Sequence, residues 1–381
     1  HRFAEVDIDS ERKSVAIIED AETGNIVQLE DPTLVSFVEA WTKISIWMKH
    51  FKLTFFLTML MSMVGVRVFA DSTVFNREIN GIYYQLSNAD HSAIVLPPYS
   101  KKYSGNFVIP SSVKYGATYN VKGIAWGAFK DCSVTSVQIP SSVSSIKGEA
   151  FMGSSLHSIT IPSNITSIDK GTFENCANLT SFIIPENVTT IGEKAFAGCS
   201  NLASITIPKS VTAIGEMAFV GCANLANIVV EDDNSVYDSR NDCNAIIETN
   251  SNTLLFGCKS TIIPDDIVVI GSSAFNGCSL LTSIELPNTL SGIGSSAFSG
   301  CSSLQSLSIP SNITIISDNL LSGCSSLLSV VIPKDVKTIG TSAFSGCSSS
   351  WTSSCLGSSF FGLVNVTAFS VEPISISPKS F

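Results

Sequence analysis

Apolar and polar residues alternate along the chain with a period of 23 residues. One period, LASITIPKSVTAIGEMAFVGCAN, begins at Leu202, and another, LTSIELPNTLSGIGSSAFSGCSS, begins at Leu281. In the first half, Leu202, Ile205 and Ile207 can share one face of a short strand. Pro208 ends that strand, because proline has no N–H to continue a hydrogen-bond ladder. The first half of each unit is therefore predicted to be a short β-strand.

The second half of the unit is predicted to return the chain to the start of the next strand. Gly215 and Gly221 permit the tight bends that a return segment needs. Four side chains of this half are expected to point inward: Val211, Ile214, Phe219 and Cys222. One such unit cannot bury its own apolar face, but stacked units form a continuous core. The pattern predicts a repeat solenoid that is mainly β, with short turns or helical return segments.

Three residue types keep the same period, which makes chance agreement implausible. The prolines are Pro140, Pro162, Pro185, Pro208, Pro264, Pro287, Pro310 and Pro333. The phenylalanines are Phe129, Phe151, Phe173, Phe196, Phe219, Phe275, Phe298 and Phe344, with Leu321 in the vacant place. The cysteines are Cys176, Cys199, Cys222, Cys278, Cys301, Cys324 and Cys347. Equivalent residues are expected to form ladders through the core.

The pattern L-x-S-I-x-I-P-x-x-V-x-x-I-G-x-x-A-F-x-G-C resembles the BspA-type leucine-rich repeat of surface proteins from Bacteroides-like bacteria and some parasitic protozoa. The resemblance covers residues 123–348, with about 23 residues per unit. Residues 71–122 resemble the strand-rich N-terminal cap of that family. The resemblance implies display outside the cell, adhesion to host or neighbouring-cell proteins, and no catalytic residues.

The repeat is interrupted in one place and abandoned in another. The interval from Pro208 to Pro264 is 56 residues, so one unit has grown by 10. Two apolar runs, 245–247 and 253–256, flank Asn-Ser-Asn, which predicts a β-hairpin insertion near 231–258 that projects from the stack. Residues 349–381 form an atypical C-terminal tail, either a cap on the open end or a truncated or frame-shifted end.

Residues 48–70 are predicted to be a secretory signal peptide. Met48 is followed by two lysines, an uncharged apolar run and the small-x-small sequence Val68-Phe69-Ala70. The apolar run is shorter than the roughly 20 residues that span a bilayer. A secreted or cell-surface chain would then begin at Asp71, and residues 1–47 are an upstream segment of uncertain origin. The alternative is a small cytoplasmic segment before an uncleaved anchor.

Composition narrows the function. The chain of 381 residues is 44% apolar and only 14% charged, which is typical of a folded protein rather than a disordered one. Its formal net charge of −10 argues against nucleic acid as a partner, since phosphate contacts need clustered Lys and Arg.

No catalytic or cofactor site is predicted. In the expected mature chain only His91 and His157 remain, and no G-x-S-x-G sequence places a nucleophile. His157 is expected to face solvent from an outward strand position. No C-x-x-C is present, so zinc sites lack their usual spacing. The chain is therefore predicted not to be an enzyme and to bind no cofactor.

The ladder cysteines, which Cys132 begins, are predicted to be buried free thiols, because a core column packs Cys as a small apolar side chain. Cys243, Cys258 and Cys355 lie off the ladder, and a Cys243–Cys258 disulfide is left open. A group of carboxylates could surround calcium, but without an EF-hand spacing a solvated acidic loop is favoured: Glu231, Asp232, Asp233, Asp238 and Asp242. Five asparagines open N-x-Ser/Thr sequons: Asn164, Asn178, Asn187, Asn312 and Asn365.

The candidate binding face is one outward residue column, two positions before most of the repeat prolines. Its members are Gln138, Thr160, Ile183, Thr206, Val229, Glu285, Ser308 and Val331. The column is mostly uncharged and β-branched, which suits an extracellular or host surface protein as partner. Thr and Val also occupy strands for their β-propensity alone. A structural spacer or surface-assembly element without a specific ligand therefore remains the alternative.

Overall fold

The computed structural model describes residues 16–19, 26–29, 74–99 and 101–347. The predicted signal peptide (48–70) and C-terminal tail (349–381) lie outside the described residues. The described chain forms two compact units. The first contains residues up to Ile79 together with 84–93 and 112–120, and the second contains 80–83, 94–111 and everything from Val121 onward.

The N-terminal strands are antiparallel. β1 (Ala16–Glu19) pairs with β2 (Ile26–Leu29), and β7 (Ser112–Tyr115) pairs with β8 (Ala117–Ile124). In the first unit an aromatic cluster surrounds Arg77 of β3 (Val74–Ile79): its Nε donates to the Tyr115 hydroxyl at 3.0 Å, and its guanidinium lies 5.6 Å from the Phe75 ring centroid. This cation–π packing anchors a strand that has few buried apolar residues of its own.

Strands near the start of the repeats are ordered β10–β8–β5–β4–β3, with β7 beside β8. β4 (Ile82–Ser87) and β5 (Ser92–Val95) alternate buried and half-buried residues, and most of β8 alternates buried and exposed ones, as strands with one face on a core do. β10 (Ser145–Ile146) is the first strand of the repeats to join them, parallel to β8.

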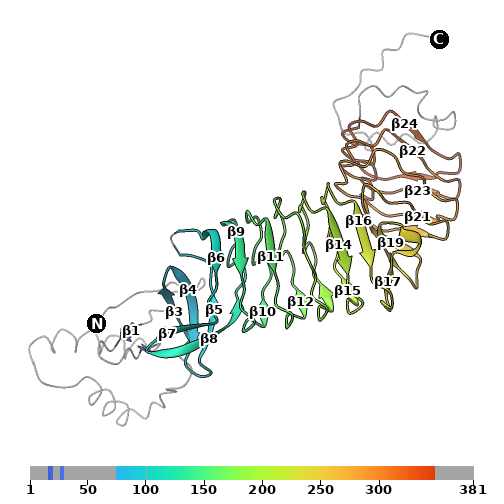
Figure 1. Ribbon diagram of the computed structural model, residues 1–381. Helices are drawn as coiled ribbons and strands as arrows, with labels where there is room; N and C mark the ends of the chain where they lie inside the picture. Colours follow the sequence, from blue (N-terminus) through green and yellow to red (C-terminus); the bar gives the residue numbers. More distant parts are fainter. Residues whose placement is uncertain (1–15, 20–25, 30–73, 100, 348–381) are drawn as a thin grey trace, which may run out of the picture. The chain divides into compact units, whose positions relative to one another are not determined.

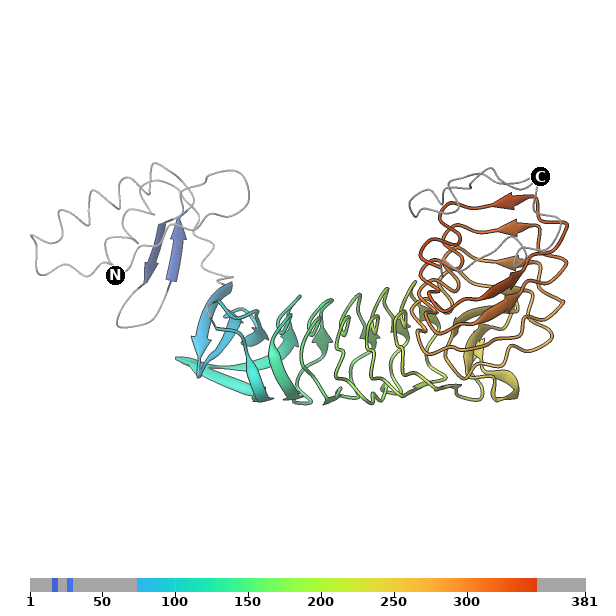
Figure 2. The same cartoon turned by 90° about the horizontal axis from the view of Figure 1, so that it is seen from above.

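The second unit is a stack of coils, most with a short strand in the first half and another in the second half (Figure 1). The first strands, where formed, pair in parallel: β6 (Ser104–Val108), β9 (Ser133–Gln138), β11 (Ser158–Thr160), β14 (Ser204–Ile207), β16 (Asn227–Val230), β22 (Ser306–Ser308) and β24 (Ser329–Val331). The second strands also pair in parallel: β12 (Ser167–Ile168), β13 (Thr190–Ile191), β15 (Ala213–Ile214), β20 (Val269–Ile270), β21 (Gly292–Ile293), β23 (Ile315–Ile316) and β25 (Thr338–Ile339). The predicted mainly-β solenoid is confirmed, and its return segments are turns (Figure 2).

The phenylalanine column forms the centre of the core. Phe151, Phe173 and Phe196 are almost completely buried, and successive rings stack with centroids 5.4–5.5 Å apart. Phe219 continues the stack 5.5 Å from Phe196, and a second stack restarts with Phe275 and Phe298 at 5.1 Å. Each ring therefore fills the space between two coils, which is why one unit alone could not fold.

The cysteine column beside the rings is buried, as predicted, except for the half-buried Cys347. From Cys176 onward, each thiol of the column donates to a carbonyl of the segment stacked before it: for example, Cys199 Sγ lies 3.2 Å from the Phe173 oxygen, and Cys222 Sγ lies 3.2 Å from the Phe196 oxygen. Burial raises the pKa of Cys176 to about 11 and that of Cys324 to about 12. The thiols therefore act as protonated hydrogen-bond donors inside the core.

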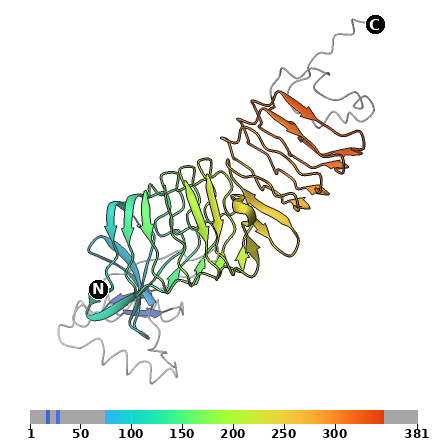
Figure 3. The same ribbon diagram turned by 45° about the vertical axis from the view of Figure 1, so that its right-hand side comes forward.

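The insertion is a hairpin, but the prediction that it projects from the stack is wrong. β18 (Ala245–Glu248) and β19 (Thr253–Gly257) pair antiparallel across the Asn-Ser-Asn turn, and β17 (Tyr237–Asp238) pairs with β18. β19 also pairs in parallel with β20 of the next coil, which places the hairpin inside the sheet of second strands (Figure 3). Ala245, Ile246 and Ile247 have no exposed surface. Burial of this apolar run stabilises the hairpin within the sheet relative to a hairpin that projects into solvent.

Candidate binding face

All members of the predicted column are exposed, and all except Ile183 and Glu285 lie in the first strands of their coils. The eight side chains are Gln138, Thr160, Ile183, Thr206, Val229, Glu285, Ser308 and Val331. Backbone register aligns several of them in neighbouring strands: Gln138 with Thr160, Thr206 with Val229, and Ser308 with Val331. Their neighbours in sequence point into the core, since Val137, Ile205 and Leu307 are buried. The period-2 alternation of the strands thus produces the column.

The column has two more members that the sequence analysis missed. Val108, 57% exposed, lies opposite Gln138 because β6 pairs in parallel with β9. Ile262, 75% exposed, occupies the same position in the coil after the insertion, two residues before Pro264. The rule that places a residue two before each repeat proline would have found Ile262, and Val108 stands in the same relation to Pro110. Both additions are apolar and β-branched.

The column is a strip of exposed apolar and hydroxyl side chains. Ile183 is 85% exposed and Val331 is 59% exposed, and Leu328 adds a large apolar group beside the column. The one ionisable member is Glu285. His157, next to the column in β11's coil, is exposed, as predicted. A face with so little charge carries a small desolvation cost when another protein covers it.

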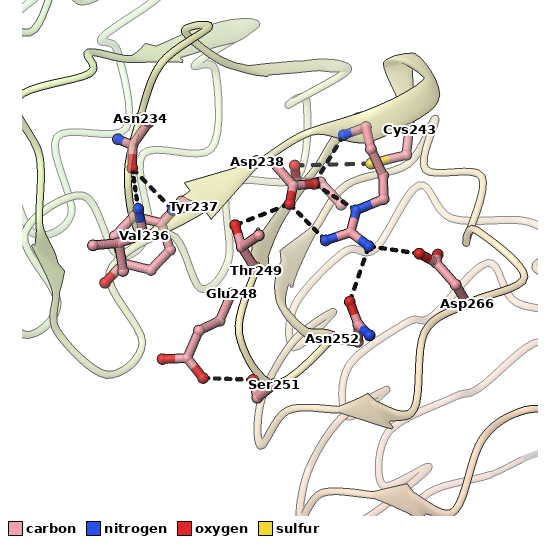
Figure 4. A network of polar contacts seen from close by, with 12 residues as sticks. Asn234, Val236, Tyr237, Asp238, Cys243, Glu248, Thr249, Ser251, Asn252 and Asp266 are labelled. Carbon is pink, nitrogen blue, oxygen red and sulfur yellow. Dashed lines mark hydrogen bonds and ion pairs between the residues drawn. The ribbon is translucent and has the colours of Figure 1, made fainter.

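The insertion is held between two coils by polar contacts (Figure 4). On the preceding side, Asn234 Nδ2 donates to the carbonyls of Pro208 and Val211, both at 3.0 Å. On the following side, Arg240 Nη1 donates to Asp266 at 2.6 Å, while its Nε and Nη2 donate to Asp238 at 2.8 and 2.6 Å. The insertion is therefore a rigid part of the stack rather than a free loop.

The predicted acidic loop does not gather its carboxylates around one point. Asp238 accepts hydrogen bonds from Arg240 and Thr249, Glu231 accepts one from the Lys209 backbone, and Asp232 and Asp233 are exposed. Within the described part of the chain, no group of three or more His, Cys, Asp or Glu side chains is arranged to hold a metal ion. Cys243 and Cys258 are both buried thiols rather than a disulfide.

None of the described segments forms a helix with the length and hydropathy that a membrane span requires.

Comparison with known proteins identifies the class. The family described as BspA type Leucine rich repeat region matches residues 122–243 and 247–367, in 6 copies. The chain belongs to this family of leucine-rich repeat proteins. No curated protein sequence matches the chain.

Solved structures that are similar to the chain include the following two. The pneumococcal vaccine antigen PcpA is 21% identical, with a TM-score of 0.57, over 72% of this chain and 80% of that one. A leucine-rich cell surface protein from Faecalibacterium prausnitzii A2-165 is 25% identical, with a TM-score of 0.46, over 70% of this chain and 95% of that one. The likeness to PcpA supports the repeat solenoid fold.

Proposed function

We propose that the chain is a non-enzymatic binding protein that is secreted or displayed on a cell surface, and that it adheres to an extracellular protein through the outward column. The observation that carries this proposal is the exposed, almost uncharged column of side chains from Val108 to Val331. Extended, weakly charged faces of repeat solenoids suit protein partners, because many shallow contacts add along the stack.

The family membership and the predicted signal peptide support the location, and PcpA is described as a pneumococcal vaccine antigen. Ile183, Ile262 and Val331 are large apolar side chains exposed to solvent. Exposing them gives no stability to the free protein, whereas a partner that covers them gains binding energy.

The test is a panel of immobilised extracellular-matrix and cell-surface proteins probed with the full chain. A partner found in this panel should lose binding to the double variant Ile183→Lys, Thr206→Glu, because an unpaired charge desolvated in an interface costs several kcal/mol. The matched control is Ile315→Lys, which adds a charge at an exposed apolar residue of a second strand, β23. It should bind like the unmodified chain.

Two outcomes would contradict the proposal. If the double variant folds and binds with unchanged affinity, the column is not the site. If no protein in the panel is captured, the spacer or surface-assembly alternative is favoured.

A further inference from the structure

The corners of the coils carry a ladder of backbone hydrogen bonds with one missing link. In the regular coils, the backbone N–H two residues before the core phenylalanine, or before Leu321, donates to a carbonyl of the next coil. Lys194 N, for example, donates to the Glu216 oxygen at 3.0 Å, and Ser273 N donates to the Ser295 oxygen at 2.9 Å. The remaining links are Gly127 to Gly148, Glu149 to Lys170, Gly171 to Glu193, Ser296 to Asp318 and Asn319 to Thr341. The expected link from Met217 to Ser272 is absent from the described structure.

The insertion causes this gap. Gly257 N of β19 donates to the Ala274 oxygen at 2.9 Å, the acceptor that Phe219 N would use in a regular stack. The Phe256 ring stands edge-on to Phe219, 5.5 Å away, where another stacked ring would lie. Regular pairing resumes at Gly221 N, which donates to the Asn276 oxygen at 2.9 Å. The two coils are therefore hydrogen-bonded to each other at Gly221 but not at Met217.

A cleft of about 360 Å³ opens at the separated end. One wall presents Ile214, Glu216 and Met217, and the other presents Leu255, Phe256 and Ser272. Ile214, predicted to point fully inward, is only half-buried, whereas its equivalents Ile191 and Ile270 have no exposed surface. The cleft volume falls within the range of small ligand sites.

The chemistry of the two walls is complementary. The Met217 N–H is a donor on one wall and the Ser272 carbonyl is an acceptor on the other, and neither has a hydrogen bond within the described residues. By analogy with Lys194, the Met217 N–H points toward the following coil. The apolar side chains of Ile214, Leu255 and Phe256 also line the cleft, and Glu216, which is exposed, is the one ionisable residue of the lining.

We propose that this cleft binds an extended peptide segment of a partner protein. The carbonyl of one peptide unit accepts from the Met217 N–H, and an N–H of the segment donates to the Ser272 carbonyl, which restores the missing link. An apolar side chain of the peptide packs between Met217 and Phe256, and a Lys or Arg beside it faces Glu216. Peptides that add to an open backbone edge gain affinity from main-chain hydrogen bonds and specificity from side-chain pockets.

This site differs from the strand column, so the two can be tested separately. The full chain is panned against a displayed library of random heptapeptides, and selected peptides are measured against Ser272→Trp and Ser295→Trp. These serines occupy the same exposed position in adjacent coils, but only Ser272 faces the gap. Ser272→Trp should weaken binding about tenfold or more, and Ser295→Trp should not change it.

Amide hydrogen exchange gives a readout that needs no variant. In the free chain the Met217 amide should exchange faster than the hydrogen-bonded Lys194 amide, and the selected peptide should protect it. The proposal is overturned if the library yields no peptide whose binding depends on Ser272, or if the Met217 amide stays unprotected in the complex. It is equally overturned if chitooligosaccharides, which carry acetamido groups, protect that amide and the peptides do not.

Discussion

The regular coils and the coil with the insertion differ in the groups that each coil packs against its neighbour. In the coils that contain Phe151, Phe173 and Phe196, each ring stacks on the ring one coil away. Backbone amides pair with the next coil, and the Cys199 thiol donates to the Phe173 carbonyl of the preceding coil. At the insertion, an edge-on Phe256 and the Gly257 amide replace those partners. The difference teaches that a repeat stack tolerates a foreign segment when its apolar residues are buried, even if one backbone link is lost.

Phenylalanine substitutions should give the largest difference in unfolding free energy between the regular coils and the insertion. Phe196 has no exposed surface and lies between Phe173 and Phe219, so Phe196→Ala should cost roughly 3 to 5 kcal/mol of unfolding free energy. Phe256 lines the open cleft, so its truncation leaves a less enclosed cavity, and Phe256→Ala should cost about 3 kcal/mol or less. Urea unfolding followed by two probes measures both values and checks two-state behaviour.

The control is Thr206→Ala on the outward face, which should stay within about 0.5 kcal/mol of the unmodified chain. Equal losses for the two phenylalanine variants would show that the insertion is packed as tightly as the regular coils. A large loss for Thr206→Ala would mean that the inward and outward faces are misassigned.

The ion-pair network of the insertion should give an intermediate and pH-dependent effect. Partial burial alone would raise the pKa of Asp238, but hydrogen bonds from Arg240 and Thr249 outweigh it and lower this pKa below its ordinary value. Because the folded pKa is lowered, the contribution of Asp238 is present above the unfolded carboxyl pKa of about 4 and is lost as the pH falls through the folded value.

Arg240→Gln should therefore cost about 1 to 2 kcal/mol at pH 7, since it leaves the partly buried Asp238 without its charged partner. It should also flatten the decline in stability below about pH 4. Urea midpoints at several pH values test this, with Lys170→Gln as control, because the side chains of the Lys170–Glu193 pair are more exposed, at 53% and 42%, than those of Arg240 and Asp238. Parallel pH profiles for Arg240→Gln and the unmodified chain would rule out a stabilising role for the network.

The regular coils could be predicted from the sequence, because each position carries its own residue type. The repeat proline marks the end of the strand, and the Ala-Phe and Gly-Cys pairs mark the core ring and the core thiol. The residue two positions before the proline is then predicted to face outward, as Ile183 does. The solenoid and the candidate column therefore followed from spacing alone. Ile262 was missed because the irregular interval hid the strand before Pro264, although the same spacing rule applies there.

The position of the insertion could not be predicted, for a physical reason. The runs around Ala245 and Thr253 specify an antiparallel pair and its turn, but a strand's hydrogen-bonding edge carries no residue-specific signal. Whether β19 pairs with β20 or projects depends on total burial across three segments. The cleft beside Met217 follows from that choice, so no local pattern in the sequence indicates it.

Cysteine substitutions should give the smallest difference in unfolding free energy between the regular coils and the coil after the insertion. Cys199 Sγ donates to the Phe173 oxygen at 3.2 Å, whereas Cys278, the first ladder cysteine after the insertion, donates to the Gly257 oxygen at 3.6 Å. Cys199→Ala should therefore cost about 1 kcal/mol through the lost thiol contacts, and Cys278→Ala less, because its hydrogen bond is longer. Burial raises the pKa of Cys278 to about 12, so iodoacetamide should alkylate neither thiol in the folded chain at pH 8 and both in urea. Rapid alkylation of Cys278 but not Cys199 under native conditions would show that the coils open at the insertion, and would reverse the expected order of the two alanine variants.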